Sequence, residues 1–149
     1  SVWSTNTEFD WPGKAPDLTG NFNTIFVTHE FGKTVQWQMK TGRDFSRDYP
    51  SDANAIILNE TAVKFMGLKD PIGSMVRWQV NGRLREYHVV GVVKDLLMES
   101  PFDPVKQTMY FMQPDNVNVM LLLLHKGQSV NNALAGSEKV FSVKYFRAA

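Results

Sequence analysis

The chain has 149 residues, which is enough for one domain with a substantial core or for two small lobes that share one. Hydrophobic residues make up 43% and charged residues 21%, as in folded globular proteins, and the net charge of +1 lacks the basic excess of nucleic-acid binders. The absence of cysteine excludes disulfide scaffolds, thiolate metal sites and cysteine nucleophiles.

The sequence is typical of a soluble piece cut from a longer protein. Residues 1–11 have neither the basic start nor the apolar block of a signal peptide. The longest apolar run, 119–124, is far shorter than the roughly 20 residues that span a bilayer. We therefore expect an excised domain without a membrane segment of its own.

The first forty residues predict an arm, a strand and a helix–strand pair. Residues 1–21 are rich in Trp, Pro, Gly and Asn without a period, which predicts an extended arm with Phe9 and Trp11 packed on the body. The β-branched and aromatic run 22–28 predicts a strand. In 29–41, the pattern fits a short helix from about Glu30, then a strand through Val35, Trp37 and Met39.

The middle of the chain predicts a strand that leads directly into a helix. A turn at 42–45 and a polar loop at 50–54 precede the apolar strand 55–58. Asn59 is placed to cap the free N–H groups of the following helix, and Gly67 supplies a left-handed stop. The apolar stripe of this helix contains Ala62, Val63 and Met66.

The dipeptide Asn81-Gly82 between two alternating runs predicts a two-residue hairpin of type I′. Folding about this turn pairs Val80 with Arg83, Trp78 with Arg85 and Val76 with Tyr87 on one face. Arg77 then lies opposite Glu86 on the other face, which forms a favourable cross-strand charge pair. The second strand is expected to continue through Val93.

The last third predicts a loop, two strands and a helix. A loop with two prolines covers 94–106, and strands are expected at 108–112 and 118–125, the second apolar on both faces like a central strand. Ser129 is expected to cap a helix whose inward side carries Val130, Ala133, Leu134, Val140 and Phe141. The order of elements predicts a mixed α+β fold.

No catalytic, cofactor-binding or metal-binding residues are predicted. The histidines, His29, His88 and His125, lack metal-ligand spacing. The carboxylates considered as a catalytic pair each have a turn or cap context that explains them without catalysis: Asp44, Asp48, Asp52, Glu60 and Asp95. Asp95 follows an apolar strand, a placement shared by catalytic and loop-capping carboxylates, but it has no identifiable nucleophile or base as a partner.

Four motifs in a fixed order resemble the MacB-like periplasmic core domain of FtsX-like ABC transporter permeases. They are GRDF at 42–45, AIILNETA at 55–62, DPIG at 70–73 and HVVGVVKD at 88–95. The resemblance implies a two-lobed α+β fold in which a smaller strand-rich lobe, about 43–110, is inserted into a ferredoxin-like lobe. That first lobe would comprise about 1–42 plus 111–149.

The resemblance also implies a function, a location and partners. Such domains project from the periplasmic face of the cytoplasmic membrane and couple ATP-driven movement of the membrane helices to events outside the membrane, without catalysis or a cofactor of their own. The implied partners are a second permease subunit, a cytoplasmic ABC ATPase, and a periplasmic adaptor or exported substrate, but no nucleic acid.

One feature departs from the family, and two other functions stay open. The family closes its first lobe with a strand after the last helix, but only 142–147 is left for it here, so that strand is either short and irregular or cut off. The alternatives are a free-standing periplasmic ligand- or peptide-binding module that uses the aromatic arm of Trp3, Phe9 and Trp11, and a hydrolase that uses Asp95.

Overall fold

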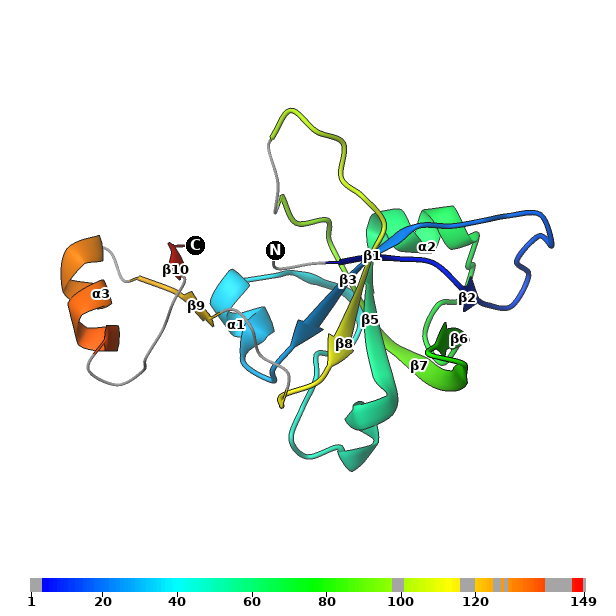
Figure 1. The fold of residues 1–149 in the computed structure, drawn as a ribbon, viewed down its shortest axis with the longest axis horizontal. Coiled ribbons are helices and arrows are strands. Elements are labelled where there is room, and N and C mark those ends of the chain that lie inside the picture. Colours follow the sequence, from blue (N-terminus) through cyan, green and yellow to red (C-terminus); the bar gives the residue numbers. More distant parts are fainter. Residues whose placement is uncertain are drawn as a thin grey trace.

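A computed structural model describes residues 4–97, 101–115, 120–124, 127, 129–138 and 146–148 (Figure 1). The fold is mixed α+β, as predicted, and is built on one strongly curled sheet. Within the described residues this sheet has eight strands: β1 (Ser4–Asn6), β2 (Phe9–Asp10), β3 (Phe22–Val27), β4 (Met39–Gly42), β5 (Ala55–Asn59), β6 (Met75–Val80), β7 (Arg83–Val93) and β8 (Thr108–Met112).

Both parallel and antiparallel pairs hold this sheet together. Its order is β1-β3-β8-β5-β7-β6-β2, and β4 pairs with the last residues of β7. β3 runs parallel to β8, and β5 runs parallel to β7 but antiparallel to β8. The central strand β5 is buried along its whole length, as its apolar sequence requires.

The predicted strand-to-helix unit is confirmed. β5 leads directly into helix α2 (Glu60–Met66), and the Asn59 side chain accepts a hydrogen bond from the Ala62 amide at 2.9 Å. Gly67 ends the helix in the left-handed conformation, with φ of 66°. Ala62 and Met66 face the core from one side of the helix.

The hairpin has the predicted turn and register. Asn81 and Gly82 both have positive φ, 49° and 74°, as a type I′ turn requires. Val80 pairs with Arg83 and Arg77 with Glu86, whose side chains form an ion pair at 3.0 Å. The second strand, β7, runs on to Val93.

The two faces of the sheet carry separate apolar clusters. One contains the N-terminal aromatics, because Phe9 stacks on Trp78 at 4.9 Å and the Trp11 indole donates to the Met66 carbonyl at 3.0 Å. Phe9 and Trp11 are only 2% and 4% exposed, which confirms that the arm packs on the body. The other cluster gathers around Tyr110, against which Trp37 packs edge-on at 5.1 Å.

Two local predictions before β5 are wrong. Val35 ends helix α1 (Phe31–Val35) and Gln36 is left-handed, so the expected strand through Val35 and Trp37 begins only at Met39. Burial of Trp37 and Phe31 against Tyr110 outweighs the alternation. The expected polar loop at 50–54 is a 3₁₀ helix, η1 (Pro50–Asn54), with Asp52 buried inside it.

The C-terminal part forms a second, small sheet beside α1 (Figure 1). Strand β9 (Met120–Leu122) pairs in parallel with β10 (Phe146–Ala148), a short strand after the last helix. Among the described residues β9 has no other strand partner, so the prediction that this segment is a central strand is wrong. Residues 118, 119 and 125 of the predicted strand lie outside the described residues.

The last helix, α3 (Val130–Glu138), forms as predicted. The Ser129 hydroxyl caps it by accepting from the Asn132 amide at 3.1 Å. Val130 does not face inward, since it is 49% exposed, and Val140 and Phe141 lie outside the described residues. In the described part of the chain, no helix combines the length and apolar character that a membrane crossing needs.

The predicted lobe boundaries stay a prediction. The eight-stranded sheet contains strands from both sides of them, since β2 pairs with β6 and β4 pairs with β7. β8 itself contains the boundary expected near residue 110.

Candidate functional site

The four sequence motifs converge around the end of β7, although the first motif begins at residue 42 and the last ends at residue 95. The glycines of the first and last motif are direct partners, because Gly42 of β4 pairs with Gly91 of β7. A Cβ on Gly91 would lie 2.3 Å from the Arg43 carbonyl oxygen, and one on Gly42 would lie 2.3 Å from that of Val90. Only glycine at both positions lets the two strands approach this closely.

The third motif closes a turn against the same strand. The Gly73 amide donates to the Val89 carbonyl at 2.8 Å, and Gly73 has a positive φ of 82°. The Ser74 hydroxyl donates to the Asp70 carbonyl at 3.1 Å, which fixes the start of the turn. The motif therefore sets where β6 begins relative to β7.

Asn59 of the second motif connects the start of α2 to the start of β8. The buried Asn59 side chain accepts from the amides of Ala62 and Thr108, both at 2.9 Å, and donates to the Lys106 carbonyl at 2.9 Å. It therefore caps the helix and also fixes the start of β8. Sequence reasoning identified only the cap, because the second contact reaches 49 residues along the chain.

Asp95 completes the cap of α2. One carboxylate oxygen accepts from the Thr61 amide at 3.1 Å and the other from the Thr61 hydroxyl at 2.7 Å. This is the capping alternative considered from the sequence, and it engages both oxygens of the carboxylate.

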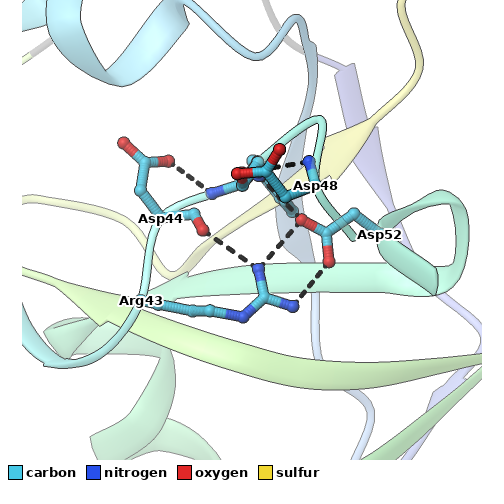
Figure 2. Close-up of polar contacts among 6 residues, drawn as sticks. Arg43, Asp44, Asp48 and Asp52 are labelled. Atoms are coloured by element: carbon cyan, nitrogen blue, oxygen red, sulfur yellow. Dashed lines mark hydrogen bonds and ion pairs between the residues drawn. The ribbon is translucent and has the colours of Figure 1, made fainter. Parts of the chain in front are cut away.

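The most buried ionic contact of the described chain joins Arg43 to Asp52 (Figure 2). Two guanidinium nitrogens of Arg43 donate to the two carboxylate oxygens of Asp52, at 2.9 and 2.7 Å. The Ser46 amide donates to the same carboxylate at 2.9 Å, and the guanidinium lies 3.9 Å from the centre of the Tyr49 ring. This geometry ties the GRDF segment to η1.

Burial and polar contacts have opposite effects on the pKa of Asp52. Burial by itself would raise that pKa, but the hydrogen bonds from Arg43 and the Ser46 amide, together with the positive charges of Arg43 and His29, lower it below the usual range. Asp52 is therefore a carboxylate held in its charged form. Sequence reasoning placed it in a turn, because nothing local indicates that the chain folds Arg43 back onto it.

The other carboxylates considered from the sequence also have local partners. Asp44 accepts from the Phe45 amide at 2.7 Å and from the Trp37 indole at 2.9 Å, and Asp48 contacts the Ser46 hydroxyl (Figure 2). Glu60 forms an ion pair with Lys40, and the hydrogen bond from Lys40 lowers the Glu60 pKa.

The histidines and carboxylates considered from the sequence do not form a common centre in the described residues. His88 is exposed on the hairpin, His29 is half-buried near Asp52, and His125 is outside the described residues. The residues that the structure describes contain no group of three or more His, Asp or Glu side chains that could hold a metal. The contacts of the motif residues join strands and a helix of the fold.

Residues 5–139 match the family described as the MacB-like periplasmic core domain, which confirms the family predicted from the motifs. A similar solved structure is the periplasmic region of MacB from Actinobacillus actinomycetemcomitans, with a TM-score of 0.64 and 15% identity over 93% of this chain and 62% of that one. Another is a domain of a permease candidate from Porphyromonas gingivalis, with a TM-score of 0.54 and 18% identity over 74% and 43%. No curated protein sequence matches.

Proposed function

The chain belongs to the MacB-like periplasmic core domain family, and on this premise we propose that it is the extracytoplasmic domain of an ABC transporter permease subunit. In this role it couples ATP-driven movement of the membrane helices to the handling of a substrate or a partner outside the membrane. The observation that carries the proposal is the family match over residues 5–139. The chain spans about 62% of the length of the similar MacB periplasmic region.

The connections among the motifs suit a domain that transmits movement. A coupling domain must move as a body, because a soft domain would absorb the displacement of its membrane segments. Here three contacts of motif residues join different elements: Gly42 to Gly91, Asn59 to Thr108 and Arg43 to Asp52. These contacts connect the sheet, α2 and η1, and β7 pairs with β4, β5 and β6.

We propose that the domain itself catalyses no reaction. Two of the carboxylates that could serve as an acid or a base already accept hydrogen bonds at both oxygens. Asp52 accepts them from Arg43, and Asp95 accepts them from Thr61. A hydrolase built on Asp95 would have to break the cap of α2 to free its base.

The proposed partners follow from the permease function. They are a second permease subunit, a cytoplasmic ABC ATPase that acts through the membrane segments, and a periplasmic adaptor or exported substrate. The proposed location is the periplasmic face of the cytoplasmic membrane. The alternative of a binding module built on an aromatic arm loses support, since Phe9 and Trp11 are buried in the domain's own core.

A distance measurement in the full-length transporter tests the coupling. The chain lacks cysteine, so one cysteine introduced at the exposed Lys69 carries a spin label to a single known position of this domain. In the reconstituted permease dimer with its ATPase, the distance between the two labels is expected to change between the nucleotide-free and ATP-bound states. An ATPase variant that cannot bind ATP is the control.

A second label position separates movement of the whole domain from movement of one loop. The exposed Asp17 lies in a different segment, and a rigid domain predicts that labels at Lys69 and Asp17 both respond to ATP. Identical distances in both nucleotide states, at both positions, would overturn the proposed coupling.

A further inference from the structure

A groove of about 630 Å³ opens before the start of β5, where the neighbouring strand β7 extends beyond it. β5 starts at Ala55, opposite His88, although its neighbour β7 has already run from Arg83. The chain before Ala55 turns away as η1 instead of filling the space between the first half of β7 and the end of β8. The groove is therefore formed by the strand arrangement itself.

The floor of the groove is apolar and largely aromatic. Phe26 of β3, Phe111 and Met112 of β8 and Tyr87 of β7 line it. The Phe26 and Tyr87 rings pack on Phe111 at 5.6 and 4.9 Å, so the core of the sheet holds the floor in place. A floor of this kind accepts an apolar ring or chain without rearranging.

The rim of the groove carries two arginines. Arg47 and Arg85 line it, together with His29 and the acidic residues Asp52 and Asp115. The charge of Asp52 is already neutralised by Arg43. Arg47 has an exposed ion pair with Glu30 at 3.1 Å, whereas Arg85 has no ion pair within the described part of the chain.

We infer that this groove binds a small amphipathic anion. The apolar body of the ligand lies on the Phe26–Phe111–Tyr87 floor, and its carboxylate, sulfonate or phosphate group lies at the rim between Arg47 and Arg85. A volume of about 630 Å³ is within the range of small-molecule sites, in which a few polar groups beside an apolar floor set orientation and specificity. The inference does not depend on the proposed coupling function.

Two fluorescent probes with the same aromatic body separate the floor from the rim. 8-Anilino-1-naphthalenesulfonate carries an anionic group, and N-phenyl-1-naphthylamine is the same ring system without it. The 149-residue chain is expected to bind both, the sulfonate more tightly. Added salt should weaken the binding of the sulfonate and leave that of the neutral probe nearly unchanged.

Arg85→Gln tests the rim. It should weaken binding of the sulfonate about fivefold, as for the loss of one partly exposed charge contact, and affect the neutral probe little. The matched control is Arg83→Gln, another exposed arginine two residues away on the same strand that does not line the groove. Because Arg85 is exposed, its substitution should leave the unfolding transition of the chain unchanged.

Ala53→Trp tests the position of the site. Ala53 is exposed and lines the groove, so a large side chain there should fill the groove and abolish binding of both probes. Ser51→Trp places the same ring on the same short helix outside the groove and should bind normally. The inference is wrong if the wild-type chain binds neither probe, if Ala53→Trp binds like wild type, or if Arg85→Gln and Arg83→Gln bind the sulfonate equally.

Discussion

Removal of the Arg43 charge is expected to destabilise the domain more than neutralisation of Asp52, although both break the same ion pair. Arg43→Met keeps the aliphatic stem but leaves the Asp52 carboxylate, 1% exposed, with only the Ser46 amide as a hydrogen-bond donor. The expected cost is about 3 kcal/mol, the size found when one partner of a buried ion pair is removed.

Asp52→Asn is expected to cost about 1–2 kcal/mol. The asparagine oxygen still accepts from Ser46, and the Arg43 side chain, 33% exposed, can reach water. Arg47→Met is the matched control, because Arg47 and its partner Glu30 are 72% and 57% exposed and such surface pairs contribute about 0–1 kcal/mol.

The difference between wild type and Arg43→Met should depend on pH in a defined direction. The folded-state pKa of Asp52 is lower than in the unfolded chain, so the unfolded chain binds its proton first as pH falls. The stabilisation is therefore fully present above the unfolded value of about 4 and is lost as pH falls through the folded-state pKa. The two proteins should approach each other in stability at the lowest pH.

Urea denaturation followed by tryptophan fluorescence, at pH 7 and at several values below 4, measures these differences as shifts in midpoint at constant slope. The reasoning is refuted if Arg43→Met costs no more than Arg47→Met at pH 7. It is also refuted if the cost of Arg43→Met is the same at pH 7 and at the lowest pH.

Three further predictions use the same measurement. Asn59→Ala should cost about 3 kcal/mol, since it removes the helix cap and leaves the buried Thr108 amide without its acceptor; a cost below about 1 kcal/mol would mean that only the cap matters. Gly91→Ala should cost at least about 2 kcal/mol through its clash with the Arg43 carbonyl, whereas Gly136→Ala, with free space around it in α3, should stabilise by about 0.5–1 kcal/mol. Asp95→Ala should cost about 1 kcal/mol by uncapping Thr61, and an unchanged midpoint would contradict the capping role.

The local elements could be predicted where neighbouring residues decide the structure. Asn81-Gly82 determines both the turn and the register of the β6–β7 hairpin, because the positive φ values and the alternation lie within a dozen residues. The same holds for the cap and the stop of α2 at Asn59 and Gly67. The prediction failed at Val35 and Trp37, where packing on Tyr110 from a distant strand overrides the local alternation.

At the site, too, local features could be predicted from the sequence and contacts between separate segments could not. The sequence identified the four motifs and their order, and with them the family, since residue types and spacing are enough for that. It did not reveal that Gly42 faces Gly91, or that Asp52 is a buried ion-pair partner and not a turn residue. Those contacts join positions 49 and nine residues apart, and only the path of the folded chain brings them together.

The sequence by itself therefore determined the class of fold, the hairpin, the strand-to-helix unit and the family. Each depends on side-chain periodicity or on the conformational preference of a few adjacent residues. The tertiary structure alone decided the order of the strands in the sheet, the ion pair of Arg43 with Asp52, and the groove left by the late start of β5. These features depend on which distant segments become neighbours, and that is set by the burial of the whole core.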